Sequence, residues 1–183
     1  MRIEIISGSP RMESVTYRVA LHLKNWFTAH TPHSVDIISM RDWSVPPVQS
    51  VWGDADKAPT ELQPLANRIF KADAFILLTP EYNGSYSPAM KNLLDHFPKQ
   101  LHKPFGIVTA SPGALGGMRA AQQLLLLVPA LFGIASPNLL IVPSVDKKFA
   151  ADGTLADETF SNAINNFTAE FLWLTEKLVP ANN

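Results

Sequence analysis

The chain has 183 residues, of which 46% are hydrophobic and 17% charged, and its 15 basic and 16 acidic side chains give a net charge of −1. Because these charges are not segregated, we expect neither a nucleic-acid nor an anionic-membrane face, nor a carrier that docks by charge. The chain has no cysteine, which excludes disulfides and thiolate metal sites and favours a cytoplasmic, reducing compartment. The length fits one domain, residues 1–183.

The first half of the chain predicts two strands and two helices. Residues 3–7 form a short apolar strand, and residues 35–38 alternate in polarity, as an edge strand does. Between them, a helix from about residue 14 carries an apolar stripe that includes Trp26. Residues 41–59 contain two tryptophans and several prolines and are expected to form an ordered loop. A second helix is expected at about residues 60–71.

The second half continues the alternation. Residues 74–79 form an unbroken apolar run, typical of a strand buried on both faces, and residues 89–97 have helical spacing, with Ser87 as the cap. Strands are also predicted at 105–110 and 139–142, separated by a helix that ends near residue 132. A stripe over 160–178 predicts a terminal helix, after which 180–183 should fray. The apolar segment 124–142 is interrupted by Pro129, Gly133 and Pro137, so no membrane span is expected.

Alternating strands and helices indicate the α/β class with a parallel sheet. Three polar or glycine-rich loops follow the first, third and fourth strands: residues 7–16, 80–87 and 110–117, hereafter the first, second and third loops. In the strand order 2-1-3-4-5 these strands are neighbours. We therefore expect the three loops to meet at the carboxyl edge of the sheet, where open α/β sheets bind ligands.

The first loop predicts an anion site. It has neither the three glycines of a dinucleotide fingerprint nor the lysine of a P-loop. It offers the hydroxyls of Ser9, Ser14 and Thr16 together with Arg11, just before a helix whose amino terminus presents free N–H groups. This set suits a compact dianion such as a terminal phosphate. The alternative is that Ser14 only caps the helix and Arg11 is solvated.

The second and third loops predict a site for a flat ring. Tyr82 offers a flanking surface, and backbone N–H groups around Gly84 suit a ring rich in carbonyls and nitrogens. The glycines of the third loop allow close approach from the other side. With a phosphate at the first loop, the ligand would be a mononucleotide. The alternative for the second loop is an ordinary surface turn.

These stretches resemble the NADPH-dependent FMN reductase family, which has the flavodoxin-like fold and includes quinone, chromate and azo-dye reductases. The resemblance is carried by Gly8-Ser9-x-Arg11-x-x-Ser14-x-Thr16, by Pro80-Glu81-Tyr82-Asn83-Gly84-Ser85 with Pro88-Ala89-x-Lys91-Asn92-x-x-Asp95, and by Ser111-x-Gly113-x-x-Gly116-Gly117. It implies a three-layer sandwich with a five-stranded parallel sheet of order 2-1-3-4-5. It also implies FMN as cofactor, NADPH or NADH as co-substrate, and a homodimer or homotetramer.

The resemblance also implies a set of cofactor-binding residues. The phosphate group of FMN would be held by Ser9, Arg11, Ser14 and Thr16; the ring would be bordered by Pro80, Glu81, Tyr82, Asn83 and Gly84; and its far side would be closed by Ser111, Gly113 and Gly116. Glu81 is expected to orient its loop or meet a neighbouring subunit. Because a flavin carries the hydride chemistry, no catalytic acid or base is expected, and the five histidines show no metal spacing.

The sequence therefore predicts an FMN-dependent oxidoreductase that passes electrons from NAD(P)H to a small acceptor, such as free flavin or a quinone, by a ping-pong route. Two alternatives come from other functional classes. One is an electron carrier without turnover on the same fold, for which the near-zero net charge is unfavourable. The other is a phospholigand-binding module without redox activity, which would be colourless when purified.

Overall fold

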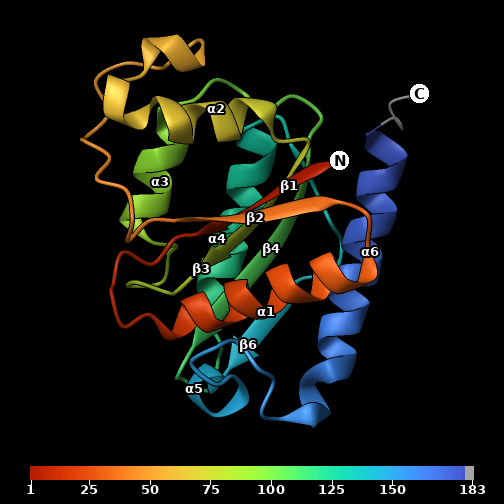
Figure 1. Ribbon diagram of the computed structural model, residues 1–183. Coiled ribbons are helices and arrows are strands. Elements are labelled where there is room, and N and C mark those ends of the chain that lie inside the picture. The colour runs from red at the N-terminus through yellow and green to blue at the C-terminus, as the bar shows by residue number, and fades with distance from the viewer. Residues whose placement is uncertain (180–183) are drawn as a thin grey trace.

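A parallel sheet runs through the centre of the molecule, with helices on both faces (Figure 1). The computed structural model describes residues 1–179, so the predicted fraying of 180–183 lies outside the described residues. The strands are β1 (Arg2–Ser7), β2 (Ser34–Ser39), β3 (Ala74–Thr79), β4 (Pro104–Ser111), β5 (Ile134–Ala135) and β6 (Leu140–Pro143). The helices are α1 (Val15–His30), α2 (Gln63–Lys71), α3 (Pro88–Asp95), α4 (Met118–Ala130), α5 (Val145–Lys148) and α6 (Ser161–Leu178).

The strand order is β2-β1-β3-β4-β5, with β6 also paired to β4, and every pairing is parallel. The predicted order 2-1-3-4-5 is thus confirmed, with one refinement at the edge. The fifth position is shared by two short strands: β5 pairs with Pro104 and Phe105, and β6 pairs with the end of β4. Residues 136–139 separate them and include Pro137, which has no N–H to continue a ladder.

The predicted three-layer sandwich is confirmed by two buried apolar clusters on opposite faces of the sheet. One cluster joins α2, α3 and α4 to the sheet, and the other joins α1 and α6 to its opposite face. Figure 1 shows the same division of helices. All six residues of β3 are buried, which places the second loop at the end of a strand held firmly on both sides.

Several boundaries differ from the predicted ones. Residues Thr60–Leu62 form a 3-10 turn before α2 begins at Gln63, α3 ends at Asp95, and α5 was not predicted. Trp26 is half-buried rather than part of the buried stripe of α1. These differences lie at helix ends and partly covered faces, where local pattern is weakest.

Residues 41–59 form an ordered segment, as predicted. The ring of Trp52 is buried and lies 4.3 Å from the ring of His96 and 5.3 Å from that of Phe97, measured between centroids. The side-chain amide of Asn92 on α3 donates to the carbonyls of Val45 and Pro46 at 3.1 and 2.9 Å. The segment is therefore fixed along α3. None of the helices within residues 1–179 is long and apolar enough to cross a membrane.

Candidate functional site

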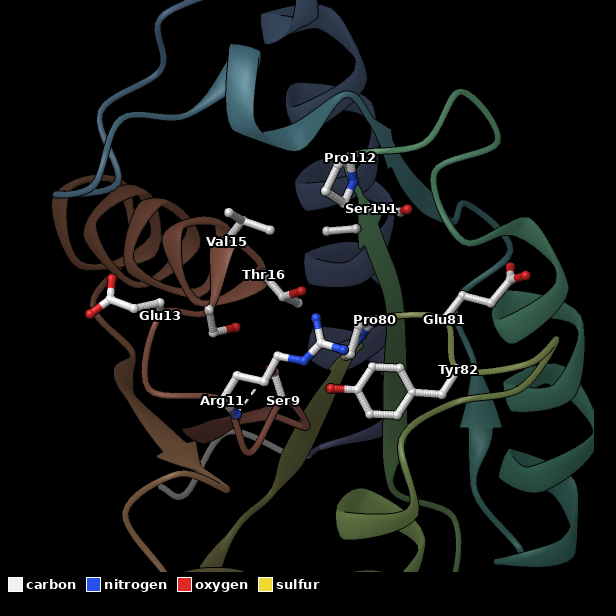
Figure 2. A pocket seen from close by; sticks show the side chains of 12 residues that line it. Ser9, Arg11, Glu13, Val15, Thr16, Pro80, Glu81, Tyr82, Ser111 and Pro112 are labelled. Atoms are coloured by element: carbon white, nitrogen blue, oxygen red, sulfur yellow. Dashed lines mark hydrogen bonds between the residues drawn. The ribbon is translucent and has the colours of Figure 1, made fainter.

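The three loops meet in one pocket at the carboxyl edge of the sheet (Figure 2). It is lined by Ser9, Arg11, Glu13, Ser14, Val15, Thr16, Pro80, Glu81, Tyr82, Ala110, Ser111 and Pro112. Eight of the predicted cofactor-binding residues are therefore brought together: Ser9, Arg11, Ser14, Thr16, Pro80, Glu81, Tyr82 and Ser111. Asn83, Gly84, Gly113 and Gly116 do not line it. The convergence expected from strand order is what the structure shows.

The first loop delivers hydroxyls to the amino terminus of α1. Ser14 is the N-cap, and its side chain accepts the N–H of Tyr17 at 3.3 Å. Ser9 is buried and its hydroxyl accepts the N–H of Arg11 at 3.4 Å. Thr16 is buried at the pocket wall, and the first turn of α1 has no acidic residue. Ser14 thus caps the helix and also lines the pocket, so its two predicted roles, as a helix cap and as a phosphate contact, are compatible.

Arg11 crosses the pocket toward the second loop. Its Cζ atom lies 5.1 Å from the centre of the Tyr82 ring, and Figure 2 shows the guanidinium directed into the space between the first and second loops. The pocket encloses about 140 Å³, less than the roughly 300 Å³ at which typical ligand pockets begin. A cavity of this size suits one end of a nucleotide, with the remainder lying against the rim.

The second loop is built around a tight two-residue turn. Tyr82 and Ser85 exchange backbone hydrogen bonds of 2.8 and 3.1 Å, and Asn83 and Gly84 between them have φ angles of 50° and 83°. Two successive positive φ angles are the geometry for which Asn-Gly is preferred. The space around Gly84 is open, since the nearest atom to an added Cβ would be Arg119 Cδ at 3.8 Å. Gly84 is therefore required by its backbone conformation rather than by crowding.

Gly84→Val is expected to weaken the binding of FMN and riboflavin alike, because a β-branched residue at φ 83° strains the turn that positions Tyr82. Gly84→Asn is the matched control, since asparagine tolerates positive φ. Fluorescence quenching titrations with both flavins measure the effect. If valine and asparagine variants bind both flavins as the parent does, the turn has no part in ring binding.

Ser87 joins the second loop to the first. Its hydroxyl donates to the carbonyl of Gly8 at 2.5 Å and accepts the N–H of Met90, so that it also caps α3 as predicted. The Ser87 N–H donates to the hydroxyl of Thr79 at 3.0 Å. A Cβ on Gly8 would lie 2.9 Å from this serine hydroxyl, so glycine is needed for the two loops to approach this closely.

Glu81 joins the second loop to α4. Its carboxylate accepts the backbone N–H of Arg119 at 3.2 Å and lies 3.4 Å from the Arg119 guanidinium. A carboxylate at the amino terminus of a helix is favoured by the helix dipole. Of the two predicted roles, this geometry supports the orientation of the loop.

The third loop contributes Ser111 and Pro112 to the pocket, whereas its predicted glycines serve the loop itself. Gly113 donates its N–H to the Ser111 hydroxyl at 3.0 Å. Gly116 has φ 61°, and a Cβ there would lie 2.7 Å from the backbone nitrogen of Pro143. Gly116 therefore allows the third loop to pack against β6.

Four pocket residues were not predicted: Glu13, Val15, Ala110 and Pro112. Each is a chain neighbour of a predicted residue, and this adjacency was the only signal that could have identified them. In Figure 2 the Glu13 carboxylate points away from Arg11, which leaves the guanidinium available to an anion.

Two electrostatic features bear on the chemistry of the site. Burial raises the pKa of the Tyr86 hydroxyl in the second loop above its ordinary value, an effect that the nearby Lys91 opposes, so the tyrosine is neutral at physiological pH. Within residues 1–179, no three His, Cys, Asp or Glu side chains gather as metal ligands do. The positive charge at this edge comes from arginines and from the amino terminus of α1.

Comparisons with known proteins agree on one family. The sequence matches the model of the family described as NADPH-dependent FMN reductase over residues 1–146. The FMN-dependent NADPH-azoreductase of Staphylococcus saprophyticus is 33% identical over 162 residues, or 85% of each chain. Its counterpart from Staphylococcus haemolyticus is 30% identical over 155 residues, 82% of this chain and 81% of that one.

A solved structure shares the fold. The flavoenzyme NAD(P)H:(acceptor) oxidoreductase of Paracoccus denitrificans matches with a TM-score of 0.79 at 24% identity, over 97% of this chain and 98% of that one.

Proposed function

This chain belongs to the NADPH-dependent FMN reductase family, and we propose that it reduces small acceptors at an FMN held by the first, second and third loops. Family membership makes it an FMN-dependent NAD(P)H oxidoreductase. The observation that carries the proposal is the convergence of the three loops on one pocket.

The phosphate group of FMN fits the first loop. The pocket places the hydroxyls of Ser9 and Thr16 and the guanidinium of Arg11 beside the amino terminus of α1. These groups donate hydrogen bonds to anionic oxygens, and the helix end favours negative charge. Arg11 adds a charge-assisted contact. The donor set therefore matches a phosphate monoester, and no acidic group in the first turn of α1 opposes it.

The flavin ring fits between the second and third loops. Tyr82 and Pro80 provide its border on one side and Ser111 with Pro112 on the other. The bound flavin supplies the hydride and electron chemistry. The chain's own residues position it: Ser87 and Glu81 fix the second loop to the first loop and to α4. No side chain is required to act as a general acid or base.

We propose free flavins, quinones or azo compounds as acceptors. The support is that relatives are named azoreductases and that the third loop leaves the pocket open, with Pro112, Ala114 and Leu115 exposed. A flat oxidised molecule can approach such an apolar rim. Initial rates with one member of each class, at a fixed NADPH concentration, rank the acceptors; no turnover with any of them would contradict the proposal.

Nicotinamide and acceptor are expected to use the same open side of the pocket in turn. Varying both substrates should therefore give parallel double-reciprocal plots, as a ping-pong route requires. The measurement is the initial rate of NADPH oxidation at several fixed quinone concentrations. Intersecting lines would mean that both substrates are bound together and would exclude this route.

We propose that two copies pair through the outer face of α4, and that a homotetramer would join two such dimers. Three exposed apolar side chains lie on this helix, Met118, Leu125 and Leu126, the last with 69% of its surface exposed, and the exposed Leu115 lies just before it. Such a stripe is unusual on a surface that stays in water. Leu126→Glu should shift the sedimentation coefficient to that of the monomer. An unchanged coefficient would place the interface elsewhere.

We also propose that residues 1–183 act as one FMN-binding domain in the cytoplasm. Within residues 1–179 one sheet packs against helices on both of its faces, and the absence of cysteine favours a reducing compartment. Release of a folded FMN-binding fragment by limited proteolysis would contradict the single domain. Recovery of the protein outside the cytoplasmic fraction would contradict the proposed location.

A further inference from the structure

The chain leaves β2 beside the first loop. Ser39 ends β2 in register with Ser7 at the end of β1, and the N–H of Met40 donates to the Ser7 carbonyl at 2.9 Å. The N–H of Asp42 then donates to the Ser39 carbonyl at 3.0 Å. This turn brings Arg41 to the same edge of the sheet as the first loop.

Arg41 lies against the first turn of α1. Its Cζ atom is 3.7 Å from the centre of the Tyr17 ring, and the N–H of Tyr17 donates to the Ser14 hydroxyl that caps the helix. Stacking on an aromatic ring leaves the N–H groups at the rim of a guanidinium able to donate. It also restricts the side chain before a ligand arrives, which lowers the entropic cost of binding.

Arg41 has donor capacity left for an anion. Among residues 1–179 its nearest carboxylate is that of Asp42, 3.4 Å from Nε; the Arg41 side chain is 24% exposed and that of Asp42 54% exposed. An ion pair with one partner in solvent contributes little. The other arginines near the pocket have partners or assigned roles. Arg119 lies beside Glu81, and Arg11 is assigned to the phosphate group of FMN.

We infer that Arg41 binds the 2′-phosphate by which NADPH differs from NADH, an inference that rests on the proposed function. A phosphate monoester offers oxygens that match the paired N–H groups of a guanidinium. In dinucleotide-binding α/β folds an arginine near the ribose accommodates the same group. Arg41 lies against the first turn of α1, at the same edge of the sheet as the pocket, which is within reach of a dinucleotide bound with its nicotinamide at the second and third loops.

The test compares two nucleotide pairs on the FMN-loaded protein. Arg41→Gln is expected to raise the KM for NADPH about tenfold, the loss typical of one charge-assisted contact, and to leave the KM for NADH within about twofold of the parent. In calorimetric titrations it should weaken the binding of 2′,5′-ADP by a similar factor without changing that of 5′-AMP. Equal changes for the ligands with the 2′-phosphate and for those without it would overturn the inference.

Two further variants keep the test decisive. Lys24→Gln removes a positive charge from α1, the helix against which Arg41 packs. Lys24 pairs with Asp36 at 2.7 Å, and this change should leave the NADPH preference unchanged. If Arg41→Gln does not fold, Arg41→Lys serves instead, because lysine keeps the charge but cannot donate a bidentate pair. A loss of affinity confined to the 2′-phosphorylated ligands supports the role of Arg41, whereas an equal loss of affinity for ligands without the 2′-phosphate overturns it. Absence of activity with either nicotinamide in the parent protein would instead contradict the proposed function.

Discussion

Arg11→Ala is expected to weaken FMN binding by roughly ten- to a hundredfold, the equivalent of about 1.5–3 kcal/mol for a charge-assisted contact. Riboflavin binding should be almost unchanged, because riboflavin has no phosphate group to pair with. Arg11 lies in the pocket, between the hydroxyls at the amino terminus of α1 and the Tyr82 ring. Fluorescence quenching with each flavin measures both affinities.

The control is Arg119→Ala, which removes an arginine from the opposite side of the second loop, where it contacts Glu81. That change should affect FMN and riboflavin to the same extent, because it acts on the loop and not on the phosphate group. If Arg11→Ala lowers the two affinities equally, Arg11 belongs to the scaffold of the pocket and the phosphate assignment is wrong.

Arg68→Met is expected to lower the free energy of unfolding by about 3 kcal/mol, because it leaves a buried carboxylate without its partner. Glu4 lies on β1 with only 3% of its side chain exposed, and Arg68 from α2 meets it with contacts of 3.0 and 2.5 Å. Burial opposes the charge of Arg68, but the hydrogen bond and charge of Glu4 outweigh this and raise the pKa of Arg68.

Urea denaturation of the parent, of Arg68→Met and of the double variant Glu4→Leu/Arg68→Met distinguishes the cause. The double variant should recover most of the stability, since replacing a buried pair by apolar groups is often close to neutral. A single variant that unfolds at the same urea concentration as the parent would show that Glu4 reaches water in this structure.

The sequence predicted the parts of the fold that depend on local pattern. The buried run of β3, the cap at Ser87 and the alternation of strands and helices each have a short-range signature, and the structure confirms them. Strand order then followed from topology, and with it the convergence of the three loops. The pocket could be placed before any of its contacts were known.

What the sequence could not predict depends on contacts between distant residues. Glu81 meets Arg119 across 38 positions of the chain, and the backbone of Pro143 requires Gly116 to lack a side chain. The division of the edge strand into β5 and β6 depends on their pairing with two separate parts of β4. None of these contacts is marked by a hydrophobic period or a sequence motif, because tertiary packing determines them.

The central claim is that this pocket binds FMN and that the bound FMN accepts electrons from NADPH. The most direct measurement is the visible spectrum of the purified protein, recorded without oxygen after adding one equivalent of FMN and then NADPH. We expect flavin absorbance that stays with the protein through gel filtration and is bleached on addition of NADPH. A protein that remains colourless after gel filtration, or bound flavin that NADPH and NADH both fail to bleach, would contradict the account.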